Sequence, residues 1–269
     1  MKRIVFCLFG VIPRSIKYTF NSMKENILDV LKDKYSVDIY VFNLNVNDVL
    51  IDGVKMNNND ISLIPYNYIE HYDQDILDIE IKNIIEKHNY KTFTRYDYGG
   101  PNGHSIENCF RQMYSEYRVG LFLEKNINNY DIAIVCGPDY FIANKINLNH
   151  IEESYNNNNI YITLANEGQG YTNGFYFGKP SVLIKSLKRY EYVDNYFPNP
   201  NDYEYIFKRS IDDNNIIRRK SDLLFFKIRA NKTIFFSHTN RLYIKTFSRS
   251  LFNEILNTYN NLCHTLKNN

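Results

Sequence analysis

The chain has 269 residues, 44% of them hydrophobic, which suffices for one large domain or two small ones. Lys and Arg (32 together) nearly balance Asp and Glu (30 together), and the formal net charge is +2. We expect no nucleic-acid partner, because bulk binding of nucleic acid usually requires a concentrated basic surface. No apolar run approaches the roughly 18 residues of a membrane-spanning helix, so we expect no transmembrane segment.

The N-terminal sequence MKRIVFCLFGVIP resembles a secretory signal only superficially. Its apolar run is short, no small-residue cleavage site follows, and Pro13 leads directly into a helical pattern. The four cysteines are scattered, form no CxxC or His/Cys cluster, and mostly lie in apolar runs, as reduced core thiols do. We therefore expect a cytoplasmic protein that is not secreted.

The first forty residues predict a strand, a helix and a second strand. Residues 3–12 form an unbroken apolar run typical of a buried strand. Ser15 is a candidate N-cap, and apolar residues then recur at helical spacing to about Tyr35. A second apolar run covers residues 37–43. Units of this kind build parallel sheets with right-handed crossovers.

The same alternation continues along the chain. Further strand patterns cover residues 132–136, 160–166, 174–180 and 223–229. Helical patterns cover residues 75–88, 106–121, 181–190, 202–209 and 251–266. We predict an α/β fold with a mostly parallel central sheet flanked by helices. No linker is evident, so we expect a single domain over residues 1–269, with a core from about 3 to 231 and a C-terminal helix at about 251–266.

Two loops follow strands of this predicted sheet, and ligands of open α/β sheets bind outside the carboxyl ends of the strands. The first loop is FGVIPRS, with Gly10 and Arg14, and the second is CGPDYF, with Asp139. Gly10 permits close approach of backbone to a ligand, and Arg14 suits a phosphate or a base edge, although both residue types are also common in plain turns. Asp139 suits Mg²⁺ or Mn²⁺, or alternatively caps the Gly-Pro turn.

Other polar residues have a structural and a functional interpretation. Arg111 and Arg118 lie on the polar face of a helix, where they suit an anionic ligand or ordinary surface ion pairs, such as Arg111 with Glu107. The loop NEGQGYTNG suits a polyhydroxylated ligand, contacted through Asn173, or forms a plain connection. Glu204 suits a general base or a helix-start acid. No dinucleotide fingerprint, P-loop or nucleophile elbow occurs.

The order of several fragments resembles a nucleotide-sugar glycosyltransferase of the GT-A type, most of all the kind found in giant viruses and some bacterial polysaccharide clusters. The fragments span residues 3–231 and read RIVFCLFGVIPRSIKYTFNSMKENIL, VDIYVF, CFRQMYSEYRVGLFLE, YDIAIVCGPDYFI, NGFYFGKPSVL, YEYIF and FFKIRAN. The resemblance implies a GT-A-like (Rossmann-like) domain. It also implies transfer of a sugar from a nucleotide-diphosphate donor to a hydroxyl of a glycan or glycoprotein acceptor. The reaction could be inverting or retaining. If the protein is viral, the resemblance implies that it acts in the host cytoplasm or the virus factory.

The resemblance also implies roles for particular residues. Asp139 corresponds to the surviving acid of the metal motif and would hold Mn²⁺ or Mg²⁺, and Glu204 would match the late acid. Glu167 is a further candidate for a catalytic carboxylate, alongside the resemblance rather than from it. Donor binding would involve Phe9, Gly10, Arg14, Arg111, Arg118, Asn173 and Gly174.

The chain departs from the family at one important position. Cys136 and Gly137 stand where the family has an arginine or a first aspartate, so the D-x-D motif is incomplete. An alternative is therefore a catalytically inactive module that binds nucleotide sugars or glycans. A nucleotidyl- or phosphotransferase would need a pair of metal carboxylates, and a protein-interaction scaffold would leave the loop residues indifferent to mutation.

Overall fold

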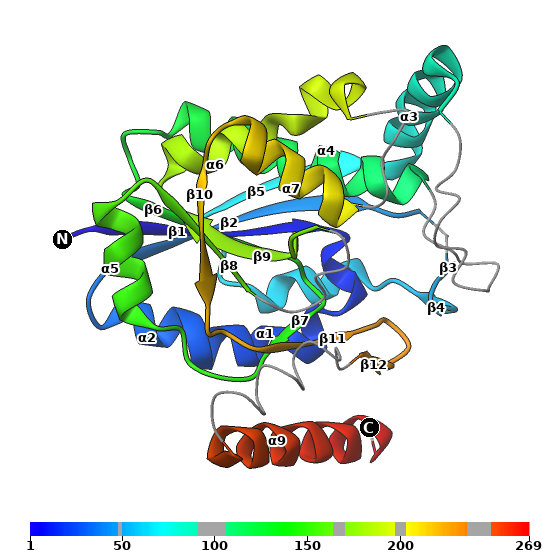
Figure 1. Ribbon diagram of the computed structural model, residues 1–269. Helices are drawn as coiled ribbons and strands as arrows, with labels where there is room; N and C mark the ends of the chain where they lie inside the picture. Colours follow the sequence, from blue (N-terminus) through cyan, green and yellow to red (C-terminus); the bar gives the residue numbers. More distant parts are fainter. Residues whose placement is uncertain (48–49, 91–105, 164–169, 197–202, 236–248, 269) are drawn as a thin grey trace.

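The computed structural model describes residues 1–47, 50–90, 106–163, 170–196, 203–235 and 249–268. Its centre is a seven-stranded sheet (Figure 1), which confirms the predicted α/β class. The strand order is β10 (Ile217–Ser221), β8 (Asn159–Thr163), β9 (Phe175–Gly178), β6 (Ile132–Cys136), β1 (Arg3–Gly10), β2 (Ser36–Asn45) and β5 (Tyr68–Asp73). All neighbouring pairs are parallel except those that β9 makes with β6 and β8.

Two hydrophobic cores cover the two faces of this sheet. Side chains of β1 alternate between them: Val5, Cys7 and Phe9 enter one core, and Ile4, Phe6 and Leu8 enter the other. This alternation follows from the two-residue period of a strand, and an apolar run without polar positions is what a strand buried on both faces requires. Full burial of one such side chain stabilises the fold by about 1.5–3 kcal/mol relative to exposure.

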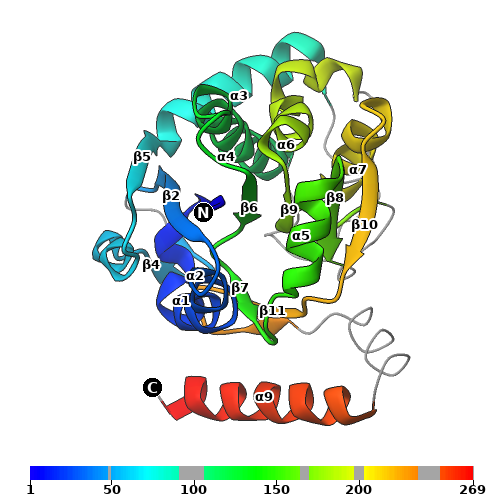
Figure 2. The same cartoon turned by 90° about the vertical axis from the view of Figure 1, so that its left-hand side faces the viewer.

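Helices form a layer on each face of the sheet (Figures 1 and 2). The first core lies under α3 (Gln74–His88), α4 (Ile106–Lys125), α6 (Pro180–Leu187), the 3₁₀ segment η4 (Lys188–Asn195) and α7 (Tyr203–Asp213). The second core lies under α1 (Ile16–Met23), α2 (Asp29–Lys32) and α5 (Leu148–Asn156). The predicted helix behind Ser15 is real, but a π-helical segment, η2 (Lys24–Leu28), interrupts it between α1 and α2.

A small second sheet lies beside α1. It contains β12 (Ile234–Phe235), β11 (Phe225–Ile228) and β7 (Tyr140–Ile142), all antiparallel. The C-terminal helix α9 (Arg249–Asn268) packs on its outer face, where the Tyr259 and Phe226 ring centroids are 5.6 Å apart. The prediction that residues 223–229 complete the main sheet is therefore wrong, because this segment pairs with β7 instead.

The remaining short elements connect these layers. A 3₁₀ turn, η1 (Ile12–Arg14), links β1 to α1, and a hairpin of β3 (Leu50–Ile51) and β4 (Val54–Lys55) follows β2. A further 3₁₀ segment, η3 (Asn58–Leu63), packs near α1. The edge strand β10 carries the charged sequence IRRKS, and its lack of an apolar pattern hides it from sequence analysis.

Candidate functional site at the carboxyl edge of the sheet

The loops that carry Arg14, Asp139 and Gly174 meet at one edge of the sheet. β1 and β6 are parallel neighbours with Leu8 opposite Cys136, so both strands end together. β9 is antiparallel to β6 with Phe175 opposite Cys136, so the start of β9 lies at the same edge. The expectation that the loops after the first and third strands share an edge is therefore met.

Asp139 lies at this edge between β6 and β7, with 9% of its surface exposed. Its backbone carbonyl accepts a hydrogen bond from the N–H of Ile228 at 2.8 Å, and one carboxylate oxygen lies 3.4 Å from Arg229 Nη1. The carboxylate thus faces the side chain of Arg229, the residue that follows β11. Among the described residues we find no backbone N–H of the Gly-Pro turn bonded to it, so its observed contact is an ion pair.

Two hydroxyl groups of α1 fix the segments on either side of this ion pair. Ser15 Oγ donates to the carbonyl of Ile228 at 2.5 Å, and Thr19 Oγ1 donates to the carbonyl of Pro138 at 2.6 Å. Both side chains are fully buried. Ser15 occupies the N-cap position of α1 as predicted, but its hydroxyl makes no cap hydrogen bond and instead ties β11 to the start of α1. One helix therefore positions both Asp139 and Arg229.

Arg14 approaches the same place from η1. Its Nη2 atom lies 3.4 Å from the Oδ2 of Asp52, on the β3–β4 turn, and the N–H of Ala230 points to that same oxygen at 3.3 Å. Burial lowers the pKa of Arg14, and the positive charge of Arg229 lowers it further, while Asp139 and Asp52 oppose the change. Arg14 Nε is buried without a hydrogen-bond partner among the described residues.

Lys227 is a third cation at this edge. Its Nζ lies 5.2 Å from the centre of the Tyr140 ring, on the strand opposite. Burial lowers the pKa of Lys227, and the charges of Arg229 and Arg14 lower it further against the attraction of Asp139 and Glu204. Three cationic side chains and their acidic neighbours therefore act on one another at the carboxyl edge.

The loop before β9 packs tightly against this cluster. The N–H of Gly137 donates to the carbonyl of Gly174 at 2.8 Å, and a Cβ at Gly174 would lie 1.8 Å from the Tyr140 hydroxyl, so only glycine fits there. Asn173 and Thr172 are 4% and 1% exposed, yet Asn173 Nδ2 and Thr172 Oγ1 have no hydrogen-bond partner among the described residues. Buried polar groups are normally paired, so these two atoms are suited to a ligand.

Glu204 starts α7 beside this loop. The Tyr171 N–H donates to the Glu204 carbonyl at 3.0 Å, and a Cβ at Gly170 would lie 1.8 Å from the same backbone, so the loop and the helix are in close contact. The charge of Glu204 also acts on Lys227 and Tyr140. Glu167, the other predicted carboxylate, lies outside the described residues.

The remaining predicted donor-binding residues differ in where they lie. Gly10 ends β1 at this edge with φ of +106°, close to Pro138, whereas Phe9 is buried in the core under α4. Arg111, on α4, makes a two-point ion pair with Asp78 of α3 at 2.7 and 2.8 Å rather than with Glu107.

Arg118 lies farther along α4 and is already paired. Its Nη2 contacts Glu70 of β5, and its Nη1 lies 3.4 Å from the Tyr114 hydroxyl. Among the described residues, Arg118 therefore has an acidic partner on β5 and shows no contact with Arg14 or Asp139.

The described residues at this edge offer fewer oxygen ligands than a divalent metal ion usually takes, and Glu167 lies outside them. Mg²⁺ and Mn²⁺ prefer several oxygen ligands, commonly from more than one carboxylate. Over the described ranges, no three His, Cys, Asp or Glu side chains gather as a metal site would require. Asp139 faces Arg229, and Cys136 is a buried thiol whose pKa burial raises well above its ordinary value.

Sequence reasoning missed three residues of this cluster: Lys227, Arg229 and Asp52. A usable signal for the first two was present, because Lys and Arg occupy alternate positions in the otherwise apolar run FFKIRA. Two charges spaced in this way on a buried strand share one face. Asp52 stands in an Asp-Gly turn, a hairpin signal that says nothing about its ion-pair partner.

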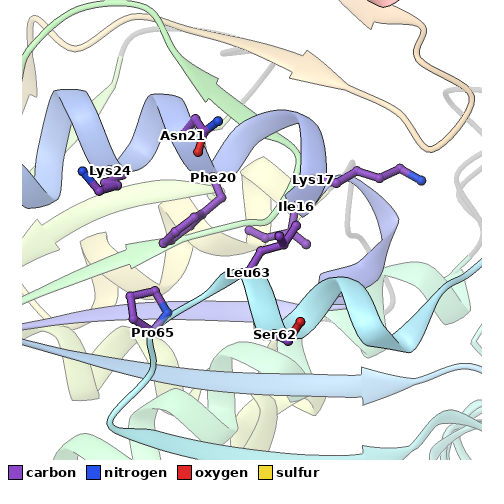
Figure 3. A pocket seen from close by; sticks show the side chains of 8 residues that line it. All are labelled: Ile16, Lys17, Phe20, Asn21, Lys24, Ser62, Leu63 and Pro65. Carbon is purple, nitrogen blue, oxygen red and sulfur yellow. The ribbon is translucent and has the colours of Figure 1, made fainter. Parts of the chain in front are cut away.

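A separate groove of about 360 Å³ lies between α1 and η3 (Figure 3). Its lining residues are Ile16, Lys17, Phe20, Asn21, Lys24, Ser62, Leu63 and Pro65. Figure 3 shows Lys17 extending away from the apolar side chains. Both lysines already have acidic neighbours, at 3.7 Å for Lys17 with Asp60 and 2.7 Å for Lys24 with Asp29, and none of the predicted site residues lines the groove.

Within the described residues, no helix combines the length and the apolar character needed to cross a bilayer.

No protein-family model matches the chain, and a search of curated proteins gives no match. Solved structures similar to it include a protein described as a nucleotide-diphospho-sugar transferase from Desulfovibrio desulfuricans G20, with 8% identity, a TM-score of 0.38, and coverage of 82% of this chain and 80% of that one. Another is mouse xyloside xylosyltransferase 1 in its apo form, with 8% identity, a TM-score of 0.39, and coverage of 82% and 85%.

Proposed function

We propose that this protein is a glycosyltransferase that moves a sugar from a nucleotide-diphosphate donor to a hydroxyl group of a glycan or glycoprotein acceptor. The observation that carries the proposal is the charged cluster at the carboxyl edge of the sheet. Arg14, Lys227 and Arg229 gather there beside the unpaired buried donor Asn173 Nδ2. The motif resemblance in the sequence points to the same reaction.

The chemistry of sugar transfer suits these groups. When the bond from the sugar to the diphosphate breaks, negative charge develops on the leaving phosphate and must be stabilised. Arg14 and Arg229 present guanidinium groups that can donate two parallel hydrogen bonds to phosphate. Gly10, with its positive φ and no side chain, lets a ligand approach the end of β1 closely.

An acceptor hydroxyl must lose a proton as it attacks the sugar. In an inverting reaction a carboxylate takes that proton, and Glu204 is our candidate because it starts α7 next to the Asn173 loop. Glu167 is the alternative base. A retaining reaction would require neither.

A second candidate function is a catalytically inactive module that binds nucleotide sugars or glycans. The observation that favours it is that Asp139 is a lone acid where a pair is usual, with Cys136 and Gly137 preceding it. The cluster of cations would serve binding equally well in such a module.

The test is a thermal-shift screen against nucleotide sugars, followed by measurement of nucleotide release. A ligand that binds only the folded state raises the Tm by mass action. We expect one nucleotide class to raise the Tm and its sugar conjugates to be turned over. Binding without release would favour the inactive module, and no response to any nucleotide sugar would refute the transferase and leave only the glycan-binding form of the module, which a glycan-binding assay would test.

The variant Glu204→Gln separates binding from chemistry. Loss of a general base typically costs about 10²- to 10⁴-fold in rate, so we expect nucleotide release to fall by that factor while the donor-induced Tm shift persists. Glu86→Gln on the exposed face of α3 makes the same chemical change away from the site and should alter neither quantity. Unchanged turnover in Glu204→Gln would remove Glu204 from the mechanism.

A further inference from the structure

We propose that Arg14, Lys227 and Arg229 bind the diphosphate of the ligand directly and do so without a divalent metal ion. The inference deepens the glycosyltransferase function proposed above and rests on it for the identity of the ligand. Its physical basis is the set of charges that already surrounds Asp139.

The three cations come from two segments that α1 and β7 hold together: the turn η1, and strand β11 with the residue after it. Arg14 lies in η1, directly before Ser15, whose hydroxyl binds the Ile228 carbonyl between Lys227 and Arg229. Lys227 is paired across the small sheet with Tyr140, the residue after Asp139. Their positions are therefore set by backbone pairing and buried hydroxyl groups, so the cations are held near one another before any ligand arrives.

The acids beside these cations bind them loosely. The Arg229–Asp139 and Arg14–Asp52 contacts are both 3.4 Å, longer than the roughly 2.7–2.9 Å of a good charge-assisted hydrogen bond. Arg14 Nε has no partner among the described residues. The guanidinium N–H groups of Arg14 and Arg229 can therefore rotate to donate to a stronger acceptor, such as a phosphate oxygen, with little loss of existing hydrogen-bond energy.

A divalent cation at the same place would meet like charges. Its carboxylate ligand would be Asp139, whose Oδ2 already lies 3.4 Å from the guanidinium of Arg229. Arg14 and Lys227 both lie close enough for their charges to interact with Asp139. The three cations attract an anion and repel a metal ion. Asp139, Asp52 and Glu204 act in the opposite sense, but their charges are already offset by these cations, so a metal ion would have to compete with them for the carboxylates.

The unpaired polar atoms next to the cluster support an anionic ligand with hydrogen-bond acceptors. Asn173 Nδ2 is a donor only, and it is buried beside Gly174, whose carbonyl binds the loop that leads to Asp139. A bound metal ion would be repelled by that amide N–H group, while a phosphate or sugar oxygen would satisfy it.

The experiment measures binding of inorganic pyrophosphate by isothermal titration calorimetry, with EDTA and separately with Mn²⁺. We expect binding in EDTA, with a Kd changed less than about threefold by Mn²⁺. Arg229→Gln and Lys227→Met should each weaken binding by roughly 10- to 100-fold, the range for one hydrogen bond to a charged group. Arg3→Gln, at the opposite edge of the sheet, is the matched control and should bind as the wild type does.

Asp139→Asn decides between the two kinds of site, because only a metal site would lose affinity for pyrophosphate. In our proposal it frees Arg229 and leaves pyrophosphate binding unchanged or tighter, whereas a metal site would lose its ligand and its affinity. Binding that requires Mn²⁺, or that Asp139→Asn abolishes in a folded protein, overturns the inference. Since pyrophosphate carries no sugar, its metal-free binding would stand even if no nucleotide sugar were turned over, and a metal-dependent transferase would refute only the inference made here.

Discussion

Removal of either partner of the buried ion pair between Glu116 and Arg189 should strongly destabilise the protein. The two side chains are 0% and 1% exposed, and Arg189 Nη2 lies 2.8 Å from Glu116 Oε2. The Tyr176 hydroxyl donates to the same carboxylate oxygen at 2.6 Å, and Gln112 Nε2 donates to the other oxygen at 3.0 Å. The network joins α4, β9 and η4.

We expect Glu116→Gln to lower the free energy of unfolding by about 3–5 kcal/mol, because it leaves the arginine charge buried and unpaired. Arg189→Met should cost about 3 kcal/mol, since two neutral donors still serve the carboxylate. In a chain of this size 1 kcal/mol shifts the Tm by roughly 2–4 °C, so each variant should melt roughly 6–20 °C lower. The double variant should cost less than the sum, with a coupling energy of about 2–3 kcal/mol.

Urea denaturation followed by circular dichroism measures these energies. The matched control is Glu86→Gln, which breaks an exposed Lys82–Glu86 pair at 3.9 Å with side chains 64–75% exposed. Such surface pairs contribute about 0.5 kcal/mol or less. The reasoning is refuted if Glu116→Gln costs no more than this control, or if the two core substitutions are additive.

Two further predictions concern the site itself. Gly174→Ala should destabilise the protein by about 3 kcal/mol, because the new Cβ would lie 1.8 Å from the Tyr140 hydroxyl. The control Gly53→Ala should cost only about 1 kcal/mol, because its φ of +76° is strained but its surroundings are open. Equal losses in Tm for the two variants would contradict this prediction. Lys227→Met should raise the Tm at pH 7, because burial lowers the pKa of Lys227 and the folded state therefore disfavours the charged form. This penalty is present below the lowered pKa and fades as the pH rises towards the ordinary value of 10.5, so the Tm difference should narrow in scans at higher pH. A Tm that falls at pH 7 would show that the attraction of Lys227 to Asp139 and Glu204 outweighs the cost of its burial.

Local pattern in the sequence determined most of the fold class. The unbroken apolar run of β1 required burial on both faces, and it enters both cores as expected. The amphipathic segment before residue 88 forms α3, which begins after an Asp73 side chain that caps Asp75 and Ile76. Strand, helix and strand in sequence implied a parallel sheet, and β1 and β2 pair in parallel. These features depend on neighbours within a few residues, which is why the sequence alone predicts them.

Sequence also placed Asp139 correctly at the end of a buried strand, but not its partners. Arg229 is 90 residues away along the chain and reaches Asp139 only because β11 pairs with β7 in a second sheet. Ser15 has the sequence of a helix cap, yet its hydroxyl binds the carbonyl of Ile228. Pairing between distant strands depends on register and on the packing of whole layers, which local pattern does not encode. The strand ends of this protein follow from its sequence, whereas the charges that meet there follow from its tertiary structure.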